Sequence, residues 1–130
     1  MFTVRKTVLN KNTFYREILK KSEEKKELRN IFIELLDFCN FNCKYCYVKN
    51  TYNSMIDYSA VLKILDQARE MGCIWITLSG GECLIHPYFK DIYKYAFEKG
   101  LKVIVLTNGY NITSEICELF KEMPPFNLDI

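Results

Sequence analysis

Apolar residues along this chain gather in four short runs that are separated by longer, mixed segments. The runs cover about residues 31–36, 73–79, 101–107 and 126–130. Ile, Val, Leu and aromatic residues dominate them, and this composition favours β-strands. Strands that are apolar at nearly every position are typical of parallel sheets, because both faces of such a sheet are covered. The pattern therefore predicts parallel strands, the fourth of which is only beginning where the sequence stops.

The segments between these runs carry apolar residues at helical spacing. Each segment also has a start or stop signal of the kind found at helix ends, so we expect one helix after each of the first three strands. Asp57 caps the first, which stops at Gly72; Pro87 lies in the first turn of the second, which stops at Gly100; and Thr113 or Ser114 caps the third, which stops at Pro124-Pro125.

Strands alternating with helices predict an α/β fold of parallel βα units with right-handed crossovers. Residues 31–130 hold about three and a half such units, whereas a complete eight-unit barrel takes about 250 residues. Residues 1–30 are different. They are expected to form a basic helical leader, with a helix at about 13–28 whose few apolar residues place it at the periphery.

Composition narrows the class of protein. Hydrophobic residues make up 49% and charged residues 26% of the 130-residue chain, which are globular values. No apolar run approaches the roughly 20 residues of a membrane span, and no export signal is visible, so we expect a cytoplasmic protein without a membrane partner. The net charge of +2 is too small to indicate nucleic acid. The charge is uneven, with +5 on residues 1–30 and −3 on the remainder. The basic segment is either a solvated helix face or a surface for an acidic or peptide partner.

Three cysteines, Cys39, Cys43 and Cys46, follow the first predicted strand at spacings of four and three. Thiolates this close in sequence can meet at one metal centre, and an iron-sulfur cluster held by three of them keeps one iron open. Disulfides are disfavoured in a reducing compartment. A redox pair formed by Cys43 and Cys46 would leave Cys39 unexplained. A zinc site stays open as an alternative, with its fourth ligand drawn from Cys73, Cys83, Cys117 or His86.

Two further loops follow predicted strands, Ser79-Gly80-Gly81-Glu82 after the second and Thr107-Asn108-Gly109 after the third. Parallel α/β folds place their chemistry at the carboxyl ends of the strands, so all three loops are expected on one rim. The glycines allow close approach to the main chain, and their carbonyls, together with the Glu82 carboxylate, could accept hydrogen bonds from an amine. Each short motif is weak alone, but the order of all three is a strong signal.

With these motifs the chain resembles the radical SAM enzymes. The pattern Cys39-x-x-x-Cys43-x-x-Cys46, with an aromatic residue before the last cysteine, matches the cluster motif of that superfamily. The Gly-Gly-Glu and Thr-Asn-Gly segments match its later regions in order and spacing. The resemblance covers about residues 31–130 and implies an N-terminal portion of a partial (βα)6 TIM-like barrel.

The resemblance also implies the site. Cys39, Cys43 and Cys46 would bind three irons of a 4Fe-4S cluster, and S-adenosylmethionine would chelate the fourth iron. Such enzymes form a 5′-deoxyadenosyl radical that abstracts hydrogen from a substrate, and they require an electron donor. No catalytic side chain is assigned. The resemblance implies that Gly80, Gly81 and Glu82 hold the amino group of S-adenosylmethionine. It also implies that Tyr45 lies near the adenine and that Asn108 lines the cofactor pocket.

The continuation Cys46-Tyr47-Val48 resembles the SPASM-type enzymes that modify peptides or other proteins, which suggests a substrate of that kind. Two positions depart from the commoner pattern: Leu36 stands where Thr is frequent, and Cys83 where Pro is frequent. The later βα units are missing, so the isolated chain is expected to be marginally folded or to need a partner for the rest of its barrel. The alternatives are a zinc-binding module and an interaction domain that pairs through its last strand.

Overall fold

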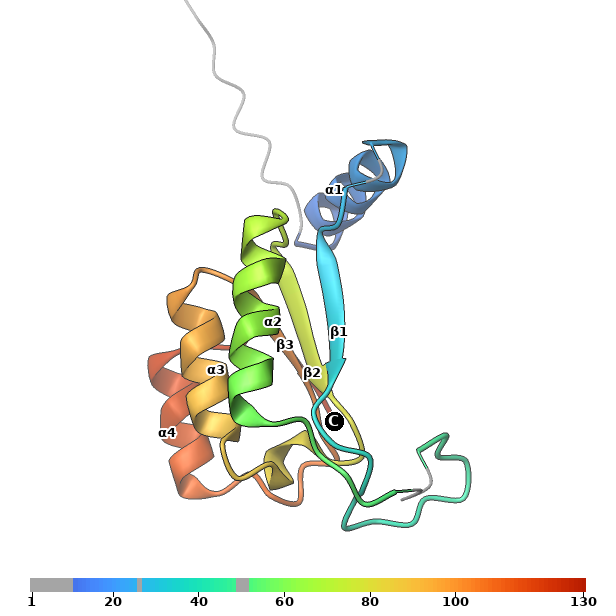
Figure 1. Ribbon diagram of the computed structural model, residues 1–130, viewed down its shortest axis with the longest axis vertical. Helices are drawn as coiled ribbons and strands as arrows, with labels where there is room; N and C mark the ends of the chain where they lie inside the picture. The colour runs from blue at the N-terminus through green and yellow to red at the C-terminus, as the bar shows by residue number, and fades with distance from the viewer. Residues whose placement is uncertain (1–10, 26, 49–51) are drawn as a thin grey trace, which may run out of the picture.

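The computed structural model describes residues 11–25, 27–48 and 52–130. Within them, four strands form one parallel sheet in the order β1-β2-β3-β4. The strands are β1 (Asn30–Glu34), β2 (Trp75–Ser79), β3 (Lys102–Leu106) and β4 (Asn127–Asp129). Each βα unit adds the next strand beside the last, so the carboxyl ends of all strands lie at the same edge of the sheet (Figure 1). The α/β fold with parallel strands is confirmed.

Helices α2 (Tyr58–Glu70), α3 (Phe89–Glu98) and α4 (Ser114–Glu122) cover one face of the sheet (Figure 1). Helix α1 (Lys11–Lys25) lies apart from this layer, near the start of β1. It falls within the predicted basic leader, whose first ten residues lie outside the described part of the chain.

Two predicted helix caps are confirmed. The Asp57 carboxylate accepts from the N–H of Ser59 at 3.0 Å, and the Thr113 hydroxyl accepts from the N–H of Ile116 at 3.4 Å. Each satisfies a backbone donor that the first helical turn leaves without a partner.

Two predicted boundaries were wrong, and one short element was missed. Pro87 does not lie in the first turn of α3, because Tyr88 is the N-cap and the helix begins at Phe89. A short 3₁₀ turn, η1 (Cys83–Ile85), precedes it and was not predicted; it forms because the Glu82 side chain caps it. Helix α1, predicted at about 13–28, ends at Lys25 rather than at residue 28. The last six residues of this helix are charged except for Ser22, so no apolar periodicity marks where it stops.

The hydrophobic core fills the layer between the sheet and α2, α3 and α4. Alternate strand residues point into this layer, which places Ile33, Ile76 and Val103 beside buried helix residues such as Leu65 and Ile92. Strand β2 has neighbours on both sides and is buried at all five positions. The opposite face is less covered at β1, where Phe32 is 52% exposed. Apolar packing therefore stabilises the sheet mainly on the face that the helices cover.

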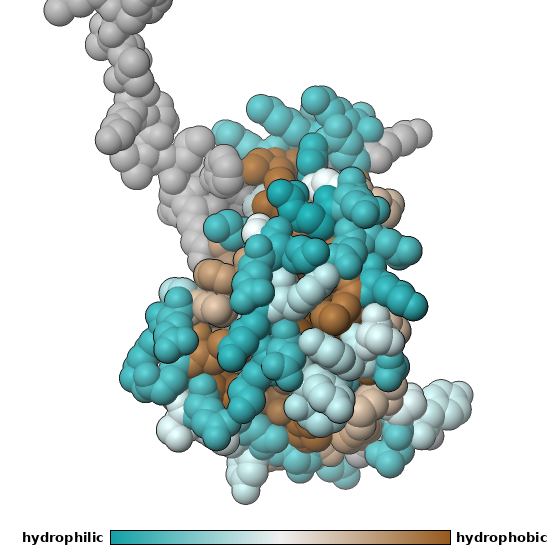
Figure 2. Space-filling model, turned by 60° about the vertical axis from the view of Figure 1, so that its left-hand side comes forward, coloured by the Kyte–Doolittle hydropathy of each residue, from teal (hydrophilic) through white to brown (hydrophobic). Residues whose placement is uncertain are grey.

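The surface presented in Figure 2 is mainly hydrophilic, with small hydrophobic areas between the polar side chains. In the described part of the chain, no helix is both long enough and apolar enough to cross a membrane.

The side chain of Tyr93 joins α3 to the segment that follows α4. It is fully buried, its ring centroid lies 5.2 Å from that of Phe120, and its hydroxyl donates to the carbonyl of Met123 at 2.7 Å. Burial raises the pKa of Tyr93, so the hydroxyl keeps its proton and remains a donor at neutral pH.

We expect Tyr93→Phe to lower the free energy of unfolding by about 1 kcal/mol, because the ring is kept and one hydrogen bond is lost. Urea denaturation measures the change. Tyr88→Phe is the matched control, since Tyr88 stacks on Tyr58 at the surface and keeps that contact without its hydroxyl. Equal losses in the two variants would contradict the role of the Tyr93 hydroxyl.

Candidate functional site

The cysteine loop leaves the sheet after β1 and returns to it just before α2. An antiparallel bridge between Leu36 and Met55 joins its ends, and Asp37 N–H donates to the carbonyl of Ser54 at 3.1 Å. The Asp37 carboxylate strengthens this closure by accepting from the N–H of Ser54 at 2.7 Å and from that of Tyr52 at 3.2 Å. The sequence did not single out Asp37, although an Asp at the start of a loop is a known turn signal.

The three predicted ligands, Cys39, Cys43 and Cys46, are free thiols on this loop, and Cys43 is exposed. Cys46 N–H donates to the carbonyl of Cys43 at 3.1 Å and closes a turn between them. No group of three or more His, Cys, Asp or Glu side chains surrounds a single ion position in residues 11–25, 27–48 and 52–130. A cubane cluster takes each thiolate on a different iron, at separate corners. The binding of a cluster by these three thiols stays a prediction.

The glycine turn after β2 packs directly on the backbone of the cysteine loop. Gly81 N–H donates to the carbonyl of Leu36 at 2.8 Å, and Glu82 N–H donates to that of Phe38 at 3.1 Å. A Cβ on Gly80 would lie 2.4 Å from the Leu36 oxygen, and one on Gly81 would lie 1.9 Å from the Phe38 oxygen. Gly80 also has a φ of +132°, a conformation that favours glycine. The close approach that these glycines permit is thus to the chain's own carbonyl groups.

The Glu82 carboxylate is fully buried between the glycine turn and the loop after β3. One oxygen accepts from the Thr107 hydroxyl at 2.7 Å and from Leu84 N–H at 3.0 Å, and the other accepts from Asn108 N–H at 2.6 Å. These bonds compensate for its removal from water. In this structure Glu82 therefore ties two loops together. Its predicted contact with a cofactor amine stays a prediction.

The side chain of Asn108 reaches from the loop after β3 to the cysteine loop. Its amide nitrogen donates to Asn40 Oδ1 at 2.8 Å and to Cys39 Sγ at 3.5 Å. Its oxygen accepts from Tyr110 N–H at 3.0 Å. The structure thus brings together the three loops that the sequence predicted on one rim.

Two tyrosines flank the last cysteine. Tyr45, the predicted adenine neighbour, is 90% exposed and has the Lys44 ammonium 5.5 Å from its ring centroid. Its contact with a cofactor stays a prediction. The hydroxyl of Tyr47 donates to Glu34 Oε1 at 2.9 Å, and this hydrogen bond raises the pKa of Tyr47. Glu34 is the one charged residue of strand β1. A charged residue in an otherwise uncharged strand was the sequence signal from which a partner for Glu34 could have been expected.

His86 also supports the cysteine loop, a role that the sequence did not predict. Its Nδ1 accepts from Tyr88 N–H at 3.2 Å, so the ring proton of the neutral form lies on Nε2 and is donated to the carbonyl of Ile56 at 3.0 Å. Ile56 N–H in turn donates to the carbonyl of Leu35 at 2.9 Å. The buried imidazole thereby connects η1 to the returning end of the loop.

The other cysteines lie in different surroundings. Cys73 and Cys83 are buried, and burial raises the pKa of both thiols. Cys83 Sγ donates to the carbonyl of Leu106 at 3.2 Å. Cys117 is exposed on α4. With His86 bound to Ile56, none of the four residues considered as a fourth zinc ligand is grouped with the cysteine loop in the described part of the chain.

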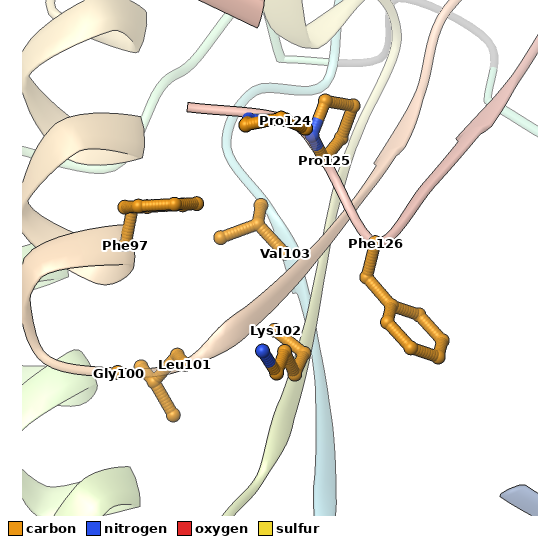
Figure 3. A pocket seen from close by; sticks show the side chains of 8 residues that line it. All are labelled: Phe97, Gly100, Leu101, Lys102, Val103, Pro124, Pro125 and Phe126. Carbon is orange, nitrogen blue, oxygen red and sulfur yellow. The ribbon is translucent and has the colours of Figure 1, made fainter. Parts of the chain in front are cut away.

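A pocket of about 370 Å³ lies at the other end of the sheet (Figure 3). Phe97 of α3 points toward Val103 of β3 in it, and Lys102 is its single charged lining residue. It lies beside the amino ends of β3 and β4 and contributes no metal-ligating side chain. The site therefore depends on the loops at the carboxyl ends, not on this cavity.

The fold and the site define a class, namely an α/β protein with a cluster-type cysteine loop at the carboxyl edge of a parallel sheet. Comparison with known proteins is more specific. Residues 33–130 match the model of the Radical SAM superfamily. The chain therefore belongs to the radical SAM superfamily, whose core is a partial TIM barrel.

Two relatives agree with this membership, and a solved structure shares the fold. The antilisterial bacteriocin subtilosin biosynthesis protein AlbA of Bacillus subtilis (strain 168) is 32% identical over 90 residues, which is 68% of this chain and 20% of AlbA. The AdoMet-dependent heme synthase of Methanosarcina barkeri (strain Fusaro / DSM 804) is 33% identical over 93 residues, 69% of this chain and 27% of that protein. Streptococcus suis SuiB bound to precursor peptide SuiA superposes with a TM-score of 0.68 at 18% identity, over 98% of this chain and 30% of SuiB. The chain spans less than a third of the length of each of these three proteins.

We expect Gly81→Ala to lower the free energy of unfolding by about 3 kcal/mol, because the new methyl group collides with the Phe38 carbonyl. Gly100→Ala is the control: its Cβ meets nothing within 4 Å, and only its φ of +77° is unfavourable, at about 1–2 kcal/mol. Urea denaturation compares them. A smaller loss for Gly81→Ala than for the control would mean that the glycine turn does not contact the loop as described.

Thiol labelling tests the surroundings of the cysteines. In the folded protein iodoacetamide should alkylate Cys43 readily and Cys83 very slowly, because the thiolate is the reactive form and burial keeps Cys83 protonated and covered. Mass spectrometry of proteolytic peptides gives both rates. In urea all six cysteines should react. Fast labelling of Cys83 before unfolding would show that its thiol is accessible.

Proposed function

We propose that this chain supplies the cluster-binding and cofactor-binding part of a radical SAM enzyme. The observation that carries the proposal is the contact of three loops at one edge of the sheet. The cysteine loop touches the glycine turn through Gly81 N–H and touches the loop after β3 through Asn108. Superfamily membership, shown over residues 33–130, supports the same function. Because the matched relatives are much longer, the activity proposed is that of the whole protein.

Cys39, Cys43 and Cys46 would each bind one iron of a 4Fe-4S cluster, which leaves the fourth iron for S-adenosylmethionine. When both groups are bound, the chemistry available is reductive cleavage of the sulfonium to a 5′-deoxyadenosyl radical, which abstracts a hydrogen atom from a substrate. The turn at Gly80, Gly81 and Glu82 would hold the amino group of the cofactor. Tyr45 would lie near the adenine, and Asn108 would line the pocket.

The chain's own residues have the task of positioning these groups. Asp37 closes the base of the loop, and His86 holds its returning end through Ile56. Gly81 sets the distance between loop and sheet, because any side chain there would push the Phe38 carbonyl away. The three ligand thiols must stay reduced to bind iron, so the protein would work in a reducing compartment such as the cytoplasm and receive electrons from a separate donor.

We further propose that the substrate is a peptide or a segment of a protein. The PqqA peptide cyclase of Streptomyces rochei is 33% identical over 91 residues, and the matched SuiB structure contains the precursor peptide SuiA. On this chain, the exposed side chains of Tyr45 and Tyr47 lie on the cysteine loop, and the exposed ring of Tyr110 lies 5.7 Å from that of Phe41 in the same loop. Such amphipathic rings suit contact with a peptide, because they bury apolar area and keep a hydrogen-bonding group.

Anaerobic reconstitution with iron and sulfide tests the proposal. The reduced protein should convert S-adenosylmethionine to 5′-deoxyadenosine, which chromatography quantifies. Cys43→Ala should lower the yield at least about 100-fold, because one cluster ligand is lost. Cys117→Ala, an exposed cysteine on α4, should leave it unchanged. Stoichiometric zinc without sulfide in the purified protein would contradict the proposal and favour the zinc module.

A further inference from the structure

The sulfur atoms of the three ligand cysteines are unequally surrounded. Cys39 Sγ accepts from the backbone N–H of Phe41 at 3.4 Å and from the side-chain amide of Asn108 at 3.5 Å. Among the described residues, no donor lies within hydrogen-bond distance of the sulfur of Cys43 or Cys46. Residues of the described part of the chain therefore supply N–H groups to one corner of the proposed cluster and to neither of the other two.

The Asn108 donor is held in place by the protein. Its backbone N–H donates to the buried Glu82 carboxylate at 2.6 Å, its side-chain oxygen accepts from Tyr110 N–H at 3.0 Å, and one amide hydrogen is used by Asn40 Oδ1 at 2.8 Å. The second hydrogen of the same nitrogen is left for Cys39 Sγ, which lies 3.5 Å away. Because these bonds fix both the backbone and the amide plane, the donor does not depend on a freely rotating side chain.

From this geometry we propose that Asn108 is a positioning residue that raises the reduction potential of the cluster through its N–H···S bond to Cys39. The inference rests on the proposed function, since it requires a cluster on these cysteines. Reduction adds negative charge that spreads onto the thiolate ligands, and an N–H donor stabilises that charge more in the reduced state than in the oxidised state. Removing the donor should therefore make the cluster harder to reduce.

The loop after β3 offers a matched pair of variants. Asn108→Ala removes the amide, and Asn108→Asp keeps the oxygen that accepts from Tyr110 N–H but has no N–H to donate. Asn111→Ala removes the same kind of side chain three residues further along the loop. The measurement is the midpoint potential of the reconstituted cluster, followed by electron paramagnetic resonance during anaerobic reductive titration without S-adenosylmethionine.

We expect Asn108→Ala to shift the reduction equilibrium about tenfold toward the oxidised cluster, which for one electron is a potential lower by about 59 mV. Asn108→Asp should lower it at least as far, because a carboxylate adds negative charge. Asn111→Ala should leave it unchanged. This readout separates the proposed role from a purely structural one, since lost stability alone would reduce the yield of cluster without moving its potential.

Two results would overturn the inference. One is a cluster in Asn108→Ala with the parent potential. The other is loss of the cluster in both Asn108 variants while the parent and Asn111→Ala retain it, which would make Asn108 a requirement for assembly. A parent protein that assembles no cluster would instead refute the proposed function, and the inference would fall with it.

Discussion

The buried carboxylate of Glu82 is the interaction on which the rest of the site depends. It joins the turn after β2 to the loop after β3 through Thr107 and Asn108, and the N–H of the same residue is bonded to the Phe38 carbonyl in the cysteine loop. All three functional loops thus meet at one residue. A buried carboxylate is costly unless its oxygens have partners, so each of these bonds stabilises the others.

The loops and the sheet are held by different forces. Apolar packing of α2, α3 and α4 on the sheet secures the strands, and it sets where each loop begins. Beyond the strand ends, positions depend on hydrogen bonds and on two glycines that admit carbonyl groups closely. Cys39, Cys43 and Cys46 are at least partly exposed, so burial contributes little to holding the centre of their loop.

Much of the fold could be predicted because its signals are local. Apolar runs marked the parallel strands, and the capping of Asp57 and Thr113 follows from side chains that bond to the next turn of helix. The predicted helix boundaries were wrong where a tertiary contact decided the boundary or where the sequence had no apolar pattern. Pro87 looked like a helix start, but the Glu82 cap and the η1 turn placed the helix two residues later. The charged first helix carried no signal for its end.

The sequence by itself determined the order of the three motifs, the spacing of the cysteines and the edge of the sheet where they lie, because parallel βα connections bring strand ends to one side. Only the tertiary structure decided which atoms meet. The bonds of Glu82 to Thr107 and Asn108, the bond from Asn108 to Cys39 and the link from His86 to Ile56 join residues 25 to 69 positions apart. Such contacts leave no periodicity in the chain, since they arise only when separate loops are packed against one another.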